Sequence, residues 1–234
     1  MNSKERAARK ALELVESNTI IGLGTGSTTR IFIELLGKQI QQGKLSHIKA
    51  VPTSEYTAQQ AANWGITLTT LAKTPYLNIA VDGADEVDPD LNLIKGLGRA
   101  LLREKIVEIH TDKLIIIVDE SKLVHRLGSR CPLPVEILPF EAEAHIHWLT
   151  TLGCQAELWL EKDGSHALTD NGNYLARCWF DDGIEDIYTL AERLAFRPGI
   201  IEHGLFLNMA HRVIVASERD TKIIKKKERE RMKE

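Results

Sequence analysis

The sequence contains few cysteines and no long apolar run. The cysteines are three in number, Cys131, Cys154 and Cys178, and none belongs to a CxxC pair. Because an odd number without such spacing does not indicate a disulfide framework, we expect reduced thiols and a cytoplasmic location. No uninterrupted apolar stretch approaches the ~20 residues that span a bilayer, and the charged N-terminal segment lacks the apolar core of a secretory signal. The sequence therefore predicts a soluble protein with no membrane partner.

The net charge is also small, −3 over 234 residues, but it is unevenly distributed. Residues 221–234 carry seven basic and three acidic side chains, so the remaining 220 residues have a net charge of −7. An acidic body argues against nucleic acid as the main partner. We interpret 221–234 as a charged C-terminal tail, the solvated and fraying end of a helix, with a nucleic-acid arm as the alternative.

Short apolar segments alternate with amphipathic ones through residues 1–128. Strands are predicted at 19–24, 47–54, 76–83 and 113–121, and helices at 29–40, 55–65 and 98–112. This alternation predicts an α/β fold, a Rossmann-like parallel sheet with helices on both faces. The nearly continuous apolar run LIIIVD agrees, since the strands of such sheets are buried on both sides.

The pattern changes between 129 and 202. A predicted helix at 140–153 is followed by strand-like segments at 154–161 and 174–181, and by a second helix at 184–196. Asp170-Asn171-Gly172-Asn173 is a strong hairpin signal, because Asn-Gly adopts positive φ at low cost. We therefore expect a small inserted α+β domain, ferredoxin-like, at 129–202. The segment 203–220 contains the strand RVIVAS, which is expected to rejoin the first sheet and complete the Rossmann-like domain.

A glycine-rich loop, Gly22-Leu23-Gly24-Thr25-Gly26-Ser27-Thr28-Thr29, lies between the first strand and the first long helix. Glycines expose backbone N–H groups, the hydroxyls add donors, and the helix N-terminus adds partial positive charge, which together predict a phosphate cradle. A tight turn with a Ser/Thr cap is the structural alternative. No lysine completes a Walker A motif, and Ser27 stands where the dinucleotide fingerprint needs its third glycine. A small phosphorylated ligand is therefore favoured over a nucleotide.

An acidic loop, Asp82-Gly83-Ala84-Asp85, follows an apolar strand. Ligands of open parallel sheets bind at this edge, so Asp82 and Asp85 are expected to accept hydrogen bonds from sugar hydroxyls. An acidic turn with a helix cap is the alternative. Glu86 and Asp88 are expected to face solvent. No histidine lies nearby to support a metal site.

A lysine and a carboxylate accompany a second glycine turn. Lys95-Gly96-Leu97-Gly98 brings backbone N–H groups close to a ligand, and Glu104 lies one to two turns into the helix that follows. A carboxylate in a dry pocket can have a raised pKa and act as a general base, whereas an isolated glutamate would pair with a surface Lys or Arg. Lys122, in the loop after LIIIVD, is a second candidate donor to phosphate or hydroxyl, or else a solvated lysine.

These loops, in this order, resemble ribose-5-phosphate isomerase of the A type. The segments GLGTGSTT, VDGADEVDP, IKGLGRALLREKIV and DESK carry the resemblance, which extends from about Thr19 to Ser217. It implies interconversion of D-ribose 5-phosphate and D-ribulose 5-phosphate through an enediolate, no metal or coenzyme, and a homodimer or homotetramer. It implies that Glu104 is the proton acceptor and that the substrate-binding residues are Thr25, Gly26, Ser27, Thr28, Asp82, Gly83, Ala84, Asp85, Lys95, Gly96, Leu97, Gly98 and Lys122.

As a hypothesis for the mechanism, Lys95 and nearby glycine N–H groups are the donors to the oxyanion, and Asp82 or Asp85 assists ring opening and orients hydroxyls. One departure is Leu97, since the family usually has glycine there. We expect strain if Leu97 adopts positive φ, and a retained contact if its N–H serves the ligand. The alternatives are a non-catalytic sugar-phosphate sensor, which would not need Lys95, both aspartates and Glu104 together, and a Rossmann oxidoreductase, which the incomplete glycine fingerprint disfavours.

Overall fold

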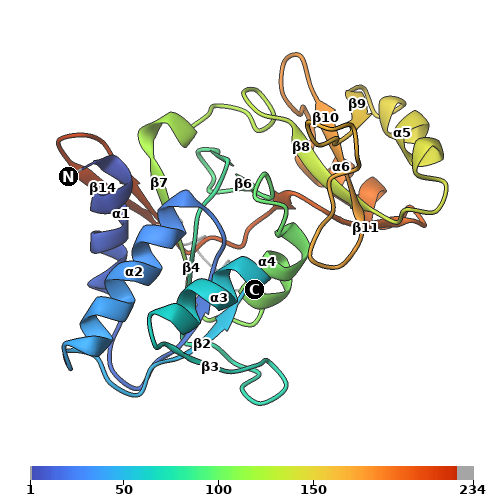
Figure 1. Ribbon diagram of the computed structural model, residues 1–234. Helices are drawn as coiled ribbons and strands as arrows, with labels where there is room; N and C mark the ends of the chain where they lie inside the picture. The colour runs from blue at the N-terminus through green and yellow to red at the C-terminus, as the bar shows by residue number, and fades with distance from the viewer. Residues whose placement is uncertain (1, 226–234) are drawn as a thin grey trace, which may run out of the picture.

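The computed structural model describes residues 2–225, and its largest element is a seven-stranded sheet (Figure 1). The strand order is β14-β13-β7-β4-β1-β2-β3. All neighbouring pairs are parallel except β13 and β14, which confirms the predicted Rossmann-like sheet. The strands are β1 (Ile20–Leu23), β2 (Lys49–Pro52), β3 (Thr67–Leu68), β4 (Ile79–Asp82), β7 (Leu114–Asp119), β13 (Arg212–Ala216) and β14 (Thr221–Lys225).

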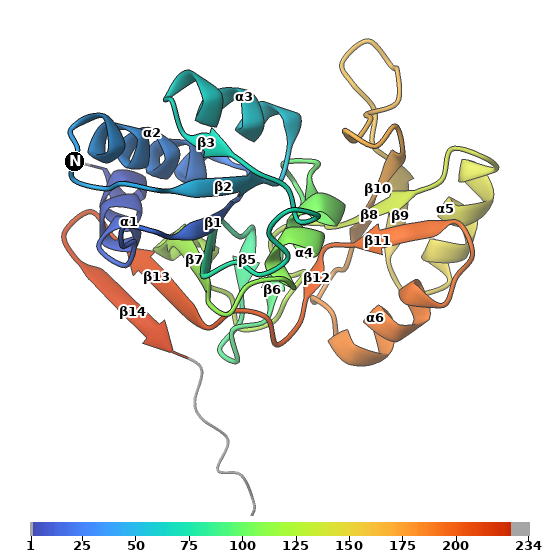
Figure 2. The same cartoon turned by 90° about the horizontal axis from the view of Figure 1, so that it is seen from below.

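Both faces of this sheet are covered, as the sequence predicted. On one face lie α1 (Ser3–Leu12), α2 (Ser27–Gln41) and α3 (Glu55–Asn63), and on the other lie α4 (Leu101–Glu108) and a small three-stranded sheet (Figure 2). In β7, Ile115 and Ile117 pack into the core beneath α1 and α2, while Ile116 and Val118 pack into the core on the opposite face. Because successive side chains of a strand point to opposite faces, a continuous apolar run fills both cores.

The three-stranded sheet was not predicted from the sequence. Its strands are β5 (Glu86–Val87), β6 (Leu93–Ile94) and β12 (Leu205–Phe206), in the order β12-β6-β5. Strands of two residues carry too little periodicity to be recognised. The expectation that Glu86 faces solvent is wrong: this side chain is fully buried, and its carboxylate accepts hydrogen bonds from the backbone N–H groups of Gly128, Arg130 and Cys131. Asp88 is half-buried and accepts from the N–H groups of Asp90 and Asn92.

A second, antiparallel sheet of four strands is built by residues 133–203, which we call the small antiparallel unit. Its chain order is β8 (Leu133–Ile137), α5 (Ala142–Thr150), β9 (Gln155–Leu158), β10 (Tyr174–Trp179), α6 (Ile187–Ala195) and β11 (Ile200–His203). The strand order β11-β8-β10-β9 is that of a ferredoxin-like fold, which confirms the expected fold class. The predicted turn before β10 is present, with Gly172 at φ 77°.

The C-terminal segment differs from its prediction. We expected 221–234 to be the fraying end of a helix, but Thr221–Lys225 forms β14, an edge strand that pairs with β13. In TKIIK, Ile223 is partly buried against one core and Ile224 against the other. The burial of these two side chains favours a strand despite the lysines on either side. Residues 226–234 lie outside the described part of the chain. Among residues 2–225, no helix has both the length and the apolar character needed to cross a bilayer.

The topology defines where a ligand can bind. From β1 the chain proceeds to β2 and β3 on one side, and then returns to β4, β7 and β13 on the other side of β1. This reversal opens a crevice at the carboxyl ends of β1 and β4, which is the usual ligand site of open α/β sheets. The glycine-rich loop follows β1 and the acidic loop follows β4, so the two predicted loops lie side by side at this crevice.

The packing of α2 on α3 gives a prediction for stability. A Cβ atom at Gly37 would lie 2.5 Å from Cβ of Trp64, so Gly37→Ala should destabilise the protein by about 1–3 kcal/mol although alanine favours helix. Denaturant unfolding measures the effect. Arg30→Ala, on the exposed face of the same helix, should change the free energy of unfolding by no more than about 0.5 kcal/mol. A stabilised Gly37→Ala variant would contradict this packing.

Candidate active site

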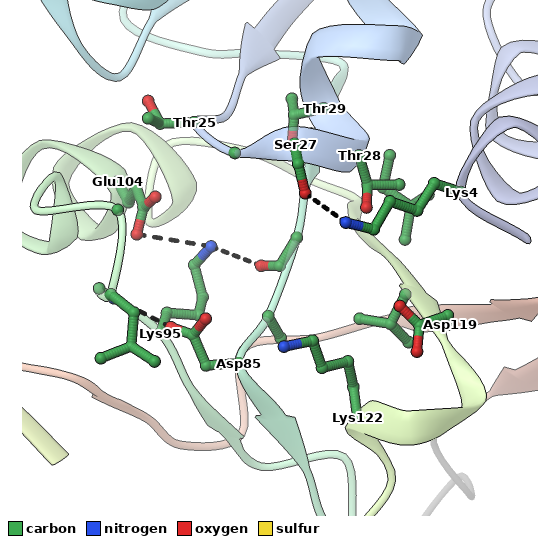
Figure 3. Close-up of a pocket in the computed structure, with 18 residues that line it drawn as sticks. Lys4, Thr25, Ser27, Thr28, Thr29, Asp85, Lys95, Glu104, Asp119 and Lys122 are labelled. Carbon is green, nitrogen blue, oxygen red and sulfur yellow. Dashed lines mark hydrogen bonds and ion pairs between the residues drawn. The ribbon is translucent and has the colours of Figure 1, made fainter. Parts of the chain in front are cut away.

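The carboxyl ends of β1, β4 and β7 surround a cavity of about 270 Å³ (Figure 3). Its walls come from the loops after β1 and β4, from the turn before α4, and from the 3₁₀ turn η1 (Glu120–Lys122). The structure therefore brings together segments that are up to about a hundred residues apart in sequence. The predicted residues that line the cavity are Thr25, Gly26, Ser27, Thr28, Gly83, Ala84, Asp85, Lys95, Gly96, Leu97, Gly98, Glu104 and Lys122.

One end of the cavity is the N-terminus of α2. Gly26 precedes the helix with φ 154°, a conformation open to glycine, and no side chain caps the first turn. The alternative interpretation of this loop, a tight turn with a Ser/Thr cap, requires a hydroxyl that caps α2, and no Ser or Thr hydroxyl of the loop does so. Uncapped N–H groups and the positive end of the helix dipole favour an anion at this position.

One lysine adds positive charge at this end. Lys4, on α1, lines the cavity and its Nζ donates a hydrogen bond of 2.8 Å to Oγ of Ser27 (Figure 3). Lys122 lines the cavity from η1, and its charge acts on Asp85 rather than on the end formed by α2. Lys4 was not predicted from the sequence, because it lies 23 positions before Ser27 and nothing in its own segment distinguishes it from the other cations of α1. The helix terminus and the ammonium of Lys4 together favour a phosphate-sized anion.

Asp82 lies beneath the cavity and does not line it. It is 1% exposed, and its Oδ1 accepts hydrogen bonds from the N–H groups of Thr25 (3.1 Å) and Gly83 (2.6 Å). A Cβ atom at Gly24 would lie 1.9 Å from Cγ of Asp82, so glycine is required for the end of β1 to approach this carboxylate. Asp82 thus joins the glycine-rich loop to the acidic loop.

At the other end of the cavity, Lys95 is buried among three carboxylates. Its Nζ lies 2.8 Å from Oδ2 of Asp82, 3.5 Å from Oε2 of Glu104 and 3.4 Å from Oε1 of Glu108. It also donates a hydrogen bond of 2.7 Å to the carbonyl oxygen of Gly83. Each of these four side chains is at most 3% exposed. One ammonium thus compensates several buried acids, which would be costly to bury without it.

Glu108 was not predicted from the sequence. It follows Glu104 by four residues, so both carboxylates lie on the same face of α4, towards Lys95. That spacing was a usable signal, but the orientation of the face was unknown without the fold.

Among the residues described, no group of three or more His, Cys, Asp and Glu side chains forms a candidate metal site. The ammonium of Lys95 occupies the space between the three carboxylates.

Burial changes the protonation of the cluster. Burial raises the pKa of Glu104 from 4.5 to about 8, against the opposing effect of Lys95. Burial likewise holds the pKa of Glu108 well above its usual range. Burial alone would lower the pKa of Lys95, but Asp82, Glu104 and Glu108 outweigh it and hold that pKa well above its usual range. The cluster therefore has a carboxyl group that gains and loses a proton close to neutral pH.

Asp85 and Leu97 contact each other at the edge of the cavity. The backbone N–H of Leu97 donates to Oδ2 of Asp85 at 3.0 Å. Leu97 does not adopt the positive φ that would strain it, because the positive φ angles of this turn fall on Gly96 (109°) and Arg99 (66°). Burial raises the pKa of Asp85, and the N–H of Leu97 opposes it. The side chain that replaces a glycine here is therefore tolerated, and its N–H orients a carboxylate.

Figure 3 shows the anion-binding end, with Lys4, Ser27 and Thr28, opposite the end that holds Glu104 and Lys95. This arrangement defines a Rossmann-like protein that holds a small phosphorylated compound beside a proton-exchanging carboxylate. The comparison with known proteins agrees. The family model for ribose 5-phosphate isomerase A (phosphoriboisomerase A) matches residues 49–220. Ribose-5-phosphate isomerase A of Rhodopseudomonas palustris (strain TIE-1) is 48% identical over 219 residues, which cover 91% of this chain and 93% of the relative.

A probable ribose-5-phosphate isomerase 2 of Arabidopsis thaliana is 44% identical over 225 residues, which cover 94% of this chain and 85% of the relative. Among solved structures, ribose 5-phosphate isomerase of Plasmodium falciparum superposes with a TM-score of 0.91 at 38% identity, covering 96% of this chain and 98% of that one. A D-ribose-5-phosphate isomerase in complex with phospho-erythronic acid gives a TM-score of 0.92 at 40% identity, covering 96% and 100%.

The chain belongs to the ribose 5-phosphate isomerase A family. As a member of this family it is an aldose–ketose isomerase. The sensor and oxidoreductase alternatives have no support among these relatives.

The raised pKa of Glu104 gives a prediction for stability. Glu104 keeps a proton in the folded state that the unfolded chain releases, so between its unfolded pKa of 4.5 and about 8 it makes the folded state less stable as pH rises. Glu104→Gln removes this contribution. The free energy of unfolding of Glu104→Gln minus that of the wild type should therefore increase from pH 5 to pH 8, by at most about 1.4 kcal/mol per pH unit.

Urea unfolding of both proteins at several pH values measures this difference. Glu34→Gln, at an exposed i,i+4 pair with Lys38, is the matched control and should show no such trend. Equal pH dependence for the two variants would contradict the raised pKa.

Proposed function

We propose that this chain interconverts D-ribose 5-phosphate and D-ribulose 5-phosphate with Glu104 as the base. The observation that carries the proposal is the position of Glu104, which lines the cavity, is 2% exposed, and lies next to Lys95. Glu104 takes the proton from C2 of the open-chain aldose and returns it to C1 of the enediolate. Another proton moves from O2 to O1, so the atoms balance. A base whose pKa is near neutral suits both halves of this transfer.

Lys95 and Asp85 complete the reacting end. The ammonium of Lys95 stabilises the negative charge that develops on the enediolate oxygens, at a place where burial strengthens the interaction. Asp85 lines the cavity and has a raised pKa, so we assign it the proton transfer of ring opening. Asp82 is already bound to Thr25, Gly83 and Lys95, and its proposed role is to orient Lys95.

The anion-binding end holds the phosphate of the substrate. The N-terminus of α2, with Gly26, Ser27 and Thr28, provides N–H and hydroxyl donors, and Lys4 provides charge. The N–H and the hydroxyl of Thr25 already donate to Asp82 and Ser54, so the proposed role of Thr25 is to hold this loop in place. Fixing the phosphate at one end of the cavity places C1 and C2 at the other end, so that binding energy orients the reacting carbons.

The remaining proposals concern the cellular context. We propose that the chain acts in the cytoplasm, in the non-oxidative pentose phosphate pathway, as a homodimer or homotetramer without metal or coenzyme. The acidic body of the chain supports a small-molecule partner rather than nucleic acid. We also propose a division into a Rossmann-like domain (1–128 and 203–220) and a small inserted domain (129–202), which the continuous run of β8 to β11 supports.

The assignment of the base predicts the result of a conservative substitution. Glu104→Gln should lower kcat at least about 100-fold, because the amide cannot accept a proton, while KM for ribose 5-phosphate changes little. A coupled assay that follows ketose formation measures both constants. Glu108→Gln is the matched variant, since Glu108 is equally buried but does not line the cavity; it should keep at least about ten times the turnover of Glu104→Gln. Near-normal turnover of Glu104→Gln would overturn the assignment.

The assignment of the phosphate end predicts a loss of binding. Lys4→Met removes a charged donor and should raise KM about 10-fold with little change in kcat, as expected for one charge-assisted hydrogen bond. Lys10→Met is the control, because Lys10 lies on the same helix and pairs with Glu13 instead. An equal KM for the two variants would exclude Lys4 from phosphate binding.

A further inference from the structure

The segment that carries Glu104 is attached to the small antiparallel unit by three basic side chains. Arg99 binds Glu161, Arg103 binds the loop at Asp170, and Lys105 binds Glu202 and the carbonyl oxygen of His203. Arg103 and Lys105 are the immediate neighbours of Glu104, which points the other way, to Lys95 and the cavity. The unit thus contacts the segment on both sides of the proposed base.

Arg103 makes the most extensive of these contacts. Its Nε donates to Oδ1 of Asn171 (2.9 Å), one terminal nitrogen donates to Oε1 of Glu55 on α3 (2.7 Å), and the other donates to the carbonyl oxygen of Asp170 (3.1 Å). A planar guanidinium engaged at all three nitrogens has a defined position and orientation. Arg103 therefore joins α4 to α3 and to the loop 169–173.

The loop 169–173 is itself held by a buried carboxylate. Oε1 of Glu136, a fully buried residue of the central strand β8, accepts hydrogen bonds from Thr169 (2.9 Å), Asn171 (3.1 Å) and Asn173 (2.8 Å). Three donors on one buried acceptor restrict the loop strongly. Arg103 is thereby connected through Asn171 to the interior of the small antiparallel unit.

The same loop reaches the phosphate end of the cavity. Oδ2 of Asp170 accepts the N–H of Glu55, the first residue of α3 (2.8 Å). Ser54 precedes it, caps α3 through the N–H of Thr57, and accepts a hydrogen bond from the hydroxyl of Thr25 (2.8 Å). One loop therefore supports α4 on one side and the glycine-rich loop on the other.

α4 has little intrinsic means of holding its own position. It is eight residues long, and Ala100 at its N-terminus provides no side-chain cap. Helices of this length are marginal without tertiary contacts. Arg99, just before it, has a positive φ of 66° that only its surroundings maintain.

We propose that Arg103 is a positioning residue for Glu104, and that the loop 169–173 of the small antiparallel unit is the support through which it acts. The proposal rests on the proposed function, in which Glu104 is the base. An error of about 1 Å in the placement of a reacting group can cost two orders of magnitude in rate. The small antiparallel unit, which supplies none of the residues that line the cavity, then contributes to turnover by holding α4.

Arg103→Met in the full chain tests the proposal. We expect kcat for ribose 5-phosphate to fall about 10-fold, with KM within about 3-fold of the wild type. Asn171→Ala removes the hydrogen bond between Arg103 and Asn171 from the side of the loop, and it should lower kcat similarly. Arg177→Met is the matched control: Arg177 is 31% exposed, as Arg103 is, but it pairs with Glu157 inside the unit, and its removal should leave kcat unchanged.

A double variant separates positioning of Glu104 from a general loss of structure. If Arg103 acts through Glu104, adding Arg103→Met to Glu104→Gln should leave the residual kcat within about 2-fold of Glu104→Gln alone. An equal fractional loss in both backgrounds would overturn the proposal, and so would unchanged turnover of Arg103→Met in the wild-type background. Near-normal turnover of Glu104→Gln alone would instead overturn the assignment of the base, so the two failures are distinguishable.

Discussion

The structure depends on one buried ammonium group. Lys95 lies between Asp82 at the end of β4 and two glutamates of α4, and it also binds the carbonyl oxygen of Gly83. Ions in a protein interior are stable only when they are paired and hydrogen-bonded. The strand end, the acidic loop and α4 must therefore keep their mutual positions for any of the four charged side chains to remain buried. The packing that buries Lys95 among these carboxylates therefore also buries Glu104, and that burial raises the pKa of Glu104 to about 8.

The cavity has two chemically different ends. The N-terminus of α2 and the ammonium of Lys4 lie at one end, and Lys95 with its buried carboxylates lies at the other. In the function proposed above, the phosphate of the sugar binds at the N-terminus of α2, so that C1 and C2 lie beside Glu104 and Lys95.

Much of the fold could be predicted from local pattern. The apolar run of β7, the glycines around the loop after β1, and the Asn-Gly turn at 171–172 are features that few neighbouring residues determine. The prediction was wrong for β14, because the seven basic residues of 221–234 dominated the local pattern. The two apolar residues Ile223 and Ile224 pack against the sheet and favour a strand. It missed β5, β6 and β12, since a strand of two residues exists only when another segment provides its hydrogen bonds. The burial of Glu86 was missed for the same reason, as its three donors lie more than forty residues away.

The sequence by itself determined the chemical types at the site and the loops that carry them: a glycine-rich anion loop, paired aspartates, a lysine in a glycine turn, and a glutamate on the following helix. Only the tertiary structure decided that Asp82 is buried beneath the cavity, that Glu108 shares Lys95 with Glu104, and that Lys4 reaches Ser27. The physical reason is that burial and ion pairing depend on distances between segments far apart in the chain, whereas turns and helices depend on neighbours. The sequence gives the type of each residue directly, but the protonation state and the orientation of its side chain depend on the groups that the fold places around it.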